Sequence, residues 1–347
     1  MLRDSARIFL QLAIFAGILL YCRTALAQSD DGKLVFSARK PLKTLDGFRA
    51  ASGLLQRGRG EPANWWQFFA YNIYTLSPDG TGLQQLTDDG MSRKPRWSPD
   101  GRWIAYISGP ENSQSLNVMD AGGDQKTELL EREFRIHDFW WSPSSHAILA
   151  AVETDRAVDP MENWVVTIDG ESKQRRRMSA WAKGWFYWDA EGREVKEPSV
   201  KLIDALPEGV NWPKWSPDRR HIAFVTDRGL SLAEVETTSV TGTWYSQRDE
   251  PPCDVVEEWF SDGTRILFYA AGDVCIATVA AGRIDEVMNL SMSSGRHATW
   301  SPDGAQVAFV SRPSGNKNFE IFVVKIETGD VTQVTYTNYD HFDLHWR

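Results

Sequence analysis

The residues of this sequence best suited to acid–base or metal chemistry are histidines and aspartates that stand shortly before a tryptophan. His137, His297 and His341 each lie three to five residues ahead of such a tryptophan, and Asp138 and Asp343 occupy comparable positions. Imidazole and carboxylate groups titrate or coordinate divalent metals, so a cluster of them would be a candidate site. Whether these groups meet depends on the elements that carry them.

No compact catalytic motif accompanies these residues. The sequence has no HExxH, no P-loop, no dinucleotide fingerprint, no redox CxxC and no G-x-S-x-G. Glycoside hydrolysis would need two carboxylates facing across a pocket, and the 47 Asp and Glu residues nominate no pair. We therefore predict no cofactor and no metal, and we interpret the histidines as polar residues that hydrate a channel. A metal or acid–base site is the alternative.

Five segments share one pattern, which predicts the elements that carry these side chains. Each has a tryptophan, then Ser-Pro-Asp-Gly or a variant of it, then an apolar run such as IAFV or VAFV. Ser-Pro-Asp-Gly suits a tight turn and the apolar run suits a strand, so each copy reads as a β-hairpin. The copies recur mostly every ~40–45 residues, the period of a four-stranded propeller blade. The repeat tryptophans are Trp97, Trp141, Trp215, Trp259 and Trp300.

The two ends of the chain supply complementary parts of one further blade. Residues 33–38, 71–80 and 83–87 read as second, third and fourth strands without a first, and 342–347 (FDLHWR) reads as a first strand alone. Pairing them removes an exposed sheet edge. We therefore predict an all-β, six-bladed β-propeller with a split first blade. The longest interval between repeat tryptophans is interpreted as an insertion, with a seventh blade as the alternative.

The repeated W-S-P-D-G pattern, with its I-A-F-V strand, resembles the WD-like (PD40-type) repeats of TolB-like propellers. Similar repeats form the propeller domains of prolyl-oligopeptidase-family enzymes, and one polysaccharide-lyase family has a metal site on a related propeller. The resemblance covers most of residues 33–347 and implies a propeller fold. It implies little about function, because propellers host many activities. The alternative function is a hydrolase or lyase with its site at the mouth of the central channel.

The N-terminus is predicted to be a targeting segment. Basic residues precede the apolar run at 8–20, which is short for a membrane span, and Ala-Leu-Ala at 25–27 fits a cleavage site. We predict a signal peptide at 1–27 and a single propeller domain at 28–347. Lipoprotein processing at Cys22 and an uncleaved anchor are the two alternatives.

The predicted signal places the mature protein in the periplasm or outside the cell, peripheral to a membrane at most. Cys253 and Cys275 are then exposed to an oxidising compartment, where a disulfide between them is one interpretation and two separate buried thiols are the other. The net charge of −9 argues against nucleic-acid binding. We predict a monomer.

Propeller topology sorts the connections onto two faces. The Ser-Pro-Asp-Gly turns and the turns between third and fourth strands lie on one face, which we call the turn face. The other face, which we call the variable face, carries the second-to-third-strand loops and the links between blades. These connections differ widely in length and include insertions at about 39–69 and 180–211. Long loops on a rigid scaffold often carry function.

Aromatic and basic residues concentrate in those two insertions, and we predict that they bind a protein or glycan partner on the variable face. The alternative is that the rings pack the loops onto the blades. The sequence therefore predicts an exported, non-catalytic binding protein. The candidate residues are Trp65, Trp66, Trp181, Trp185, Tyr187, Trp188, Arg57 and Arg59.

Overall fold

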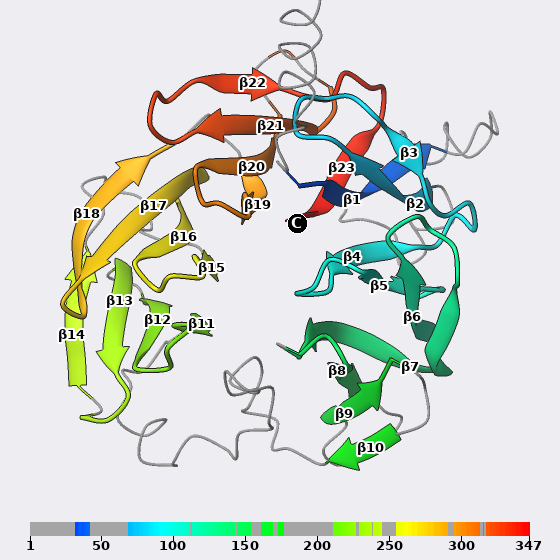
Figure 1. Ribbon diagram of the computed structural model, residues 1–347, viewed down its shortest axis with the longest axis horizontal. Coiled ribbons are helices and arrows are strands. Elements are labelled where there is room, and N and C mark those ends of the chain that lie inside the picture. The colour runs from blue at the N-terminus through cyan, green and yellow to red at the C-terminus, as the bar shows by residue number, and fades with distance from the viewer. Residues whose placement is uncertain are drawn as a thin grey trace, which may run out of the picture.

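The computed structural model of the chain is an all-β fold built around a common axis. Six four-stranded antiparallel sheets stand around that axis like the blades of a propeller (Figure 1). Among the residues that the structure describes, no helix is long and apolar enough to cross a bilayer. The described residues are 32–41, 69–111, 113–142, 144–153, 161–168, 173–176, 211–226, 229–237, 239–244, 255–290, 295–312, 315 and 317–347.

Each blade has four strands, which follow one another from the axis outward. Blade 1 consists of β23 (Asp340–Trp346), β1 (Leu34–Pro41), β2 (Phe69–Leu76) and β3 (Gln84–Gln85); blade 2 of β4 (Arg93–Trp97), β5 (Trp103–Ser108), β6 (Gln114–Asp120) and the start of β7 (Thr127–Trp141); blade 3 of the end of β7, β8 (Ala147–Glu153), β9 (Met161–Thr167) and β10 (Lys173–Arg176); blade 4 of β11 (Asn211–Trp215), β12 (His221–Thr226), β13 (Gly229–Glu234) and β14 (Ser239–Trp244); blade 5 of β15 (Val255–Trp259), β16 (Arg265–Ala270), β17 (Asp273–Ala280) and β18 (Arg283–Asn289); and blade 6 of β19 (Arg296–Trp300), β20 (Gln306–Ser311), β21 (Glu320–Lys325) and β22 (Val331–Gln333).

Strand β7 belongs to two blades. Its first part pairs with β6, as in Leu116↔Leu130, and its second part pairs with β8, as in Trp141↔Ile148. The link from the outer edge of blade 2 to the inner edge of blade 3 is thus one extended strand. This is why seven strands form one continuous hydrogen-bonded sheet while still making two blades.

The split first blade is confirmed. The last strand, β23, pairs with β1 along registers such as Leu34↔Trp346, and the Arg347 amide donates to the Lys33 carbonyl (2.9 Å). Trp346 is buried at the inner edge of this blade. The two ends of the propeller are therefore joined through main-chain hydrogen bonds and a buried ring.

The Ser-Pro-Asp-Gly turns form as the sequence predicts. In blade 2 the Gly101 amide donates to the Ser98 carbonyl (2.9 Å), and the Ser98 hydroxyl donates to Asp100 Oδ1 (2.6 Å). Gly101 has a φ of 71°, which glycine adopts without a Cβ clash. The same serine-to-aspartate bond recurs in blades 4 and 6, at 2.7 and 2.6 Å. The turn face is therefore a repeated, internally bonded structure.

Apolar side chains of neighbouring blades form the core. The second strands contribute most, because their I-A-F-V pattern buries an aromatic ring. Phe36, Phe224, Phe268 and Phe309 are fully buried. Complete burial of such a side chain stabilises the fold by about 1.5–3 kcal/mol. The repeated sequence motif thus encodes both the turn and the packing between blades.

Every first strand carries a β-bulge in its middle, where its register with the second strand shifts. In three blades the residue three positions before the repeat tryptophan has positive φ: Lys94 (51°), His297 (50°) and Asp343 (52°). A bulge re-aims a side chain relative to the simple alternation of a strand. The bulges therefore decide which first-strand residues face the axis.

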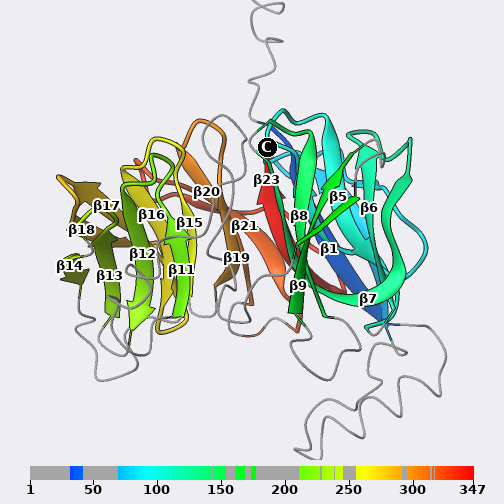
Figure 2. The same cartoon turned by 90° about the horizontal axis from the view of Figure 1, so that it is seen from below.

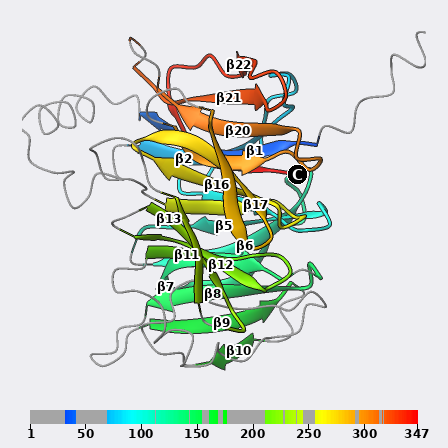
Figure 3. The same ribbon diagram turned by 90° about the vertical axis from the view of Figure 1, so that its left-hand side faces the viewer.

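The strands run between the turn face and the variable face, and the C-terminus lies on the turn face (Figure 2). A second side view shows β20–β22 and β8–β10 at opposite ends of the molecule (Figure 3). The predicted signal peptide, at 1–27, lies outside the described residues. So do 42–68 and 177–210, which hold most of the two predicted insertions.

Candidate functional site

The bulge position brings alternating basic and acidic side chains to the inner edge of four consecutive blades. Three residues before the tryptophan stand His297 in blade 6, Asp343 in blade 1, Lys94 in blade 2 and Asp138 in blade 3. Basic and acidic groups alternate along this row. Because neighbouring opposite charges attract, the row is suited to hold adjacent blades together.

Asp343 is held as a carboxylate by its neighbours. Its Oδ2 accepts hydrogen bonds from Ser37 Oγ (2.7 Å) and from the Lys94 backbone amide (3.2 Å). Burial alone would raise the pKa of this carboxyl, but nearby His297 and these two donors hold the pKa below its ordinary value. Asp343 therefore joins blade 1 to blade 2.

His137 and Asp138 are also engaged within the ring. His137 Nε2 lies 2.7 Å from Glu153 Oε2 on β8, and Asp138 Oδ1 lies 2.8 Å from Arg96 Nη2 on β4. Lys94 Nζ donates to the His137 carbonyl (2.7 Å). These contacts tie blade 2 to blade 3.

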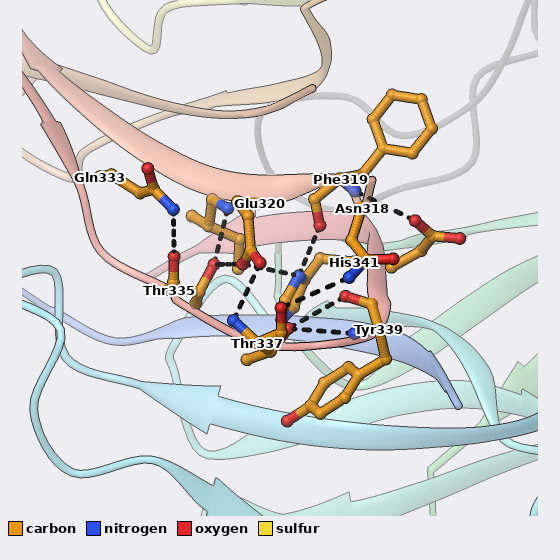
Figure 4. A network of polar contacts seen from close by, with 10 residues as sticks. Asn318, Phe319, Glu320, Gln333, Thr335, Thr337, Tyr339 and His341 are labelled. Atoms are coloured by element: carbon orange, nitrogen blue, oxygen red, sulfur yellow. Dashed lines mark hydrogen bonds and ion pairs between the residues drawn. The ribbon is translucent and has the colours of Figure 1, made fainter. Parts of the chain in front are cut away.

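His341 lies apart from the other candidates, between blades 1 and 6 (Figure 4). Its ring packs 5.2 Å from that of Phe36 and 5.3 Å from that of Tyr339, measured between centroids. Burial lowers the pKa of His341 to about 4, so the neutral imidazole donates from Nδ1 to the Phe319 carbonyl (2.7 Å). The Glu320 carboxylate lies 3.5 Å from the same nitrogen. His341 is a core residue of this interface.

The network around His341 anchors the variable-face end of blade 6 (Figure 4). Glu320 accepts hydrogen bonds from Thr335 Oγ1 (2.6 Å) and the Thr337 amide (2.9 Å). Thr335 Oγ1 also accepts from the amide of Ile321 in β21 (2.8 Å). Thr87 is its counterpart in blade 1, where Thr87 Oγ1 accepts from the amide of Ile73 in β2 (2.9 Å). The contacts fasten the fourth strand and the following link to the third strand, which is a structural role.

The three histidines that were the weak metal candidates do not converge. His137 is bonded to blade 3, His297 lies beside Asp343, and His341 is buried under Tyr339. Within the described part of the chain, no group of three His, Cys, Asp or Glu side chains is placed to hold a metal ion.

Two carboxyl groups that the sequence reasoning missed lie on β15. Burial and the neighbouring charge of Glu257 raise the pKa of Glu258 to about 7. Burial also raises the pKa of Glu257, against the attraction of Lys214 and His297. Thr299 Oγ1 on the next blade donates to Glu258 (3.4 Å). The adjacent acidic residues just before a repeat tryptophan were the signal that could have identified this pair.

A second group that sequence reasoning missed gathers at the variable-face end of blades 1 and 6. We call it the rim cluster, and it consists of Arg39, Arg296, Arg312, Phe319 and Phe342. Strand topology places all five there, because they stand at the ends of second strands or at the starts of first and third strands.

The rim cluster is built from guanidinium groups stacked on phenylalanine rings. The Cζ of Arg296 lies 3.9 Å and that of Arg312 4.9 Å from the Phe319 ring centroid. The Cζ of Arg39 lies 5.2 Å from the Phe342 centroid, and its Nη2 pairs with Asp340 (2.7 Å). Arg296 and Arg312 are exposed. The cluster therefore presents concentrated positive charge at this end of the ring.

Several predicted site residues lie outside the described residues and stay predictions. They are Trp65, Trp66, Trp181, Trp185, Tyr187, Trp188, Arg57 and Arg59. Cys275 is buried in β17, while Cys253 lies outside the described residues, so a disulfide and two separate thiols both stay open interpretations.

Comparison with known proteins places the fold. Among solved structures, TolB from Acinetobacter baumannii aligns with a TM-score of 0.53 at 14% identity, covering 91% of this chain and 66% of that one. The Tol-Pal system protein TolB of Geobacter sulfurreducens is 34% identical over 73 residues, which are 21% of this chain and 17% of the relative. No family model matches the chain. The expected TolB-like β-propeller fold is thus confirmed.

Peptidases share the same repeats. An uncharacterized peptidase of Bacillus subtilis, YuxL, is 30% identical over 131 residues, which are 37% of this chain and 19% of the peptidase. The matched region thus spans about a fifth of the length of such curated relatives. The likeness concerns propeller repeats and is shared by proteins of different function.

Proposed function

We propose that this TolB-like β-propeller is an exported, non-catalytic binding protein that takes a protein partner on its variable face. The observation that supports binding over catalysis is the mutual engagement of the polar groups at the inner edge of the ring. Asp343 is bonded to Ser37 and Lys94, and Asp138 is paired with Arg96. Polar groups that are bonded to one another across neighbouring blades are suited to a structural role rather than to catalysis.

The distribution of connections supports the choice of face. Strand β1 ends at Pro41 and β2 begins at Phe69, and β10 ends at Arg176 while β11 begins at Asn211. Both long connections leave and re-enter the described structure on the variable face. They carry five of the ten tryptophans outside the repeats and the closing strand, and such residues often dominate binding energy when they dock in a partner.

Export rests on the N-terminal sequence. Residues 1–27 have the basic start, apolar run and Ala-Leu-Ala site of a signal peptide. The test is mass spectrometry of the N-terminus of protein isolated from the fractionated expressing host. A mature N-terminus at Gln28 outside the cytoplasm supports export, and an intact Met1 in the cytoplasmic fraction contradicts it.

A specific observation favours one alternative, a hydrolase or lyase acting at the inner edge of the ring. A carboxyl with a pKa near 7, as burial and Glu257 give Glu258, is suited to general acid catalysis at neutral pH. In such an enzyme, Glu258→Gln would abolish turnover. Binding of a protein partner on the variable face would then not be needed to explain the function.

The experiment that tests the proposal combines capture with melting. The mature chain, Trp66→Ala and Trp185→Ala are used to capture proteins from envelope extract, and the captured protein is identified and then tested in purified form. We expect both variants to lose the partner at an unchanged melting temperature. Undiminished capture by both stable variants, with capture lost when the Ser-Pro-Asp-Gly turns are altered, would place binding on the turn face.

A further inference from the structure

We propose that the rim cluster binds an acidic peptide segment, so that the protein partner contributes glutamate or aspartate side chains to this end of the propeller. The inference rests on the proposed function, because it specifies the chemistry of the partner on the variable face. The rim cluster is built from described residues only.

The cluster holds more positive than negative charge. Arg296 and Arg312 stack on the same Phe319 ring, at 3.9 and 4.9 Å from its centroid. Among the residues that the structure describes, neither forms a salt bridge, and the nearby Asp340 is already paired with Arg39. Burial and the charge of Arg312 lower the pKa of Arg296. An added carboxylate would relieve the repulsion between the two guanidinium groups.

The stacking also prepares the guanidinium groups for carboxylates. A guanidinium that lies over a ring keeps its plane fixed and leaves its N–H edge for a ligand, and that edge matches the two oxygens of a carboxylate. Phe319 is only 7% exposed beneath the two arginines. Its faces are therefore covered, so a sugar cannot stack on this ring. This favours the charged side chains of a peptide over a neutral glycan.

One further cation, Lys40 of β1, also lies over aromatic rings at this end of blade 1. Lys40 Nζ lies 4.8 Å from the Tyr339 centroid and 5.0 Å from the Tyr74 centroid. Arg39 and Lys40 are consecutive in β1, so their side chains leave opposite faces of the strand, and Lys40 adds a further cation at this end of blade 1. Cations distributed in this way fit a segment with several carboxylates rather than a single anion.

The charge of the rest of the molecule favours the rim cluster as the place where an acidic segment binds. The chain has a net charge of −9, and five turns of the turn face carry an aspartate: Asp79, Asp100, Asp218, Asp262 and Asp303. An acidic segment is attracted to the locally positive rim cluster. Such complementarity guides association and weakens with added salt.

The test uses the whole mature chain and two fluorescent peptides, hexaglutamate and hexaglutamine, with binding followed by anisotropy at low and at high salt. Arg296→Gln/Arg312→Gln is the test variant. Arg102→Gln/Arg220→Gln, which removes the same charge from exposed positions on the turn face, is the matched control. Melting temperatures of all forms are measured alongside.

We expect hexaglutamate to bind, binding to weaken at least tenfold in the test variant and less than twofold in the control, and added salt to weaken it further. Equal binding of hexaglutamine, or equal loss in the control, would overturn the proposal. Trigalacturonate is the third ligand, and its binding in place of hexaglutamate would show that the carboxylates come from a glycan. If hexaglutamate does not bind while Trp66→Ala and Trp185→Ala still lose a captured protein, only this inference is wrong. If both variants retain the captured protein, the proposed function is wrong.

Discussion

The turn face and the variable face are made by the same strands but by different rules. On the turn face the same serine-to-aspartate bond and the same glycine conformation recur from blade to blade. On the variable face each blade differs, and at the ends of blades 1 and 6 the described side chains form the rim cluster. The repeat encodes the scaffold, and departures from the repeat supply the surface for which we propose a binding role.

If this division is right, changes to the scaffold cost stability and changes to the variable face cost binding. The largest expected effect comes from deleting 342–347. The deletion removes most of β23 from blade 1, along with Trp346, whose truncation alone is expected to cost about 3–5 kcal/mol. We expect loss of cooperative thermal unfolding, or aggregation, by calorimetry. Cooperative melting at the parent temperature would contradict the role of β23 in closing the ring.

Acid should weaken the interface between blades 1 and 6 through His341. Its pKa in the folded protein, about 4, lies below the ordinary value of 6.5, so unfolding takes up a proton between these values. The free energy of unfolding therefore falls as the pH is lowered from 6.5 to about 4, by about 3 kcal/mol for this group. Buried His345 adds to the fall with the same sign.

Urea unfolding between pH 7.5 and pH 4 checks this prediction. His341→Gln should flatten the dependence, because it removes the titrating group. His146→Gln, at an exposed position on the turn face, is the control and should leave it unchanged. An unaltered slope in His341→Gln would show that His341 is not buried as a neutral imidazole.

A matched pair of glycines separates packing from backbone strain on the turn face. Gly304 and Gly329 have nearly the same φ, 68° and 72°. A Cβ at Gly304 would overlap the Phe260 ring, whereas nothing lies within 4 Å of one at Gly329. We expect Gly304→Ala to be less stable than Gly329→Ala by about 1–3 kcal/mol in urea unfolding. Equal losses would mean that the turn does not pack on the neighbouring blade as described.

The smallest effect on stability is expected at the rim cluster. Arg296→Gln/Arg312→Gln removes two exposed cation–π contacts and also the repulsion between them, so the free energy of unfolding should change by less than about 1 kcal/mol. A loss as large as that of the scaffold variants, measured in the same urea series, would make the rim cluster a part of the scaffold.

The repeat made the scaffold predictable, because its cues are local. Trp-Ser-Pro-Asp-Gly and the apolar run that follows specify a hairpin within about 15 residues, and the leftover strands at the two ends specified the split blade. Bulges were not visible in this pattern. Simple alternation along β23 would put His341 and Asp343 on one face, whereas the bulge leaves Asp343 at the inner edge and His341 in the core.

The rim cluster could not be predicted, because its members are far apart in sequence. Arg296 begins β19 and Phe319 directly precedes β21, and Arg39 reaches Asp340 and Phe342 only because β23 pairs with β1. The sequence pointed to the variable face through its long loops, but the charges on that face depend on pairing across the whole chain.

The central claim is that the partner occupies the variable face, and hydrogen–deuterium exchange of the purified complex tests it most directly. We predict that the partner slows exchange in segments on the variable face, including 295–297, 317–320 and 335–342, and leaves the turns at 98–102, 216–220 and 301–304 unchanged. Protection confined to those turns, with the variable face exchanging as in the free protein, would contradict the account.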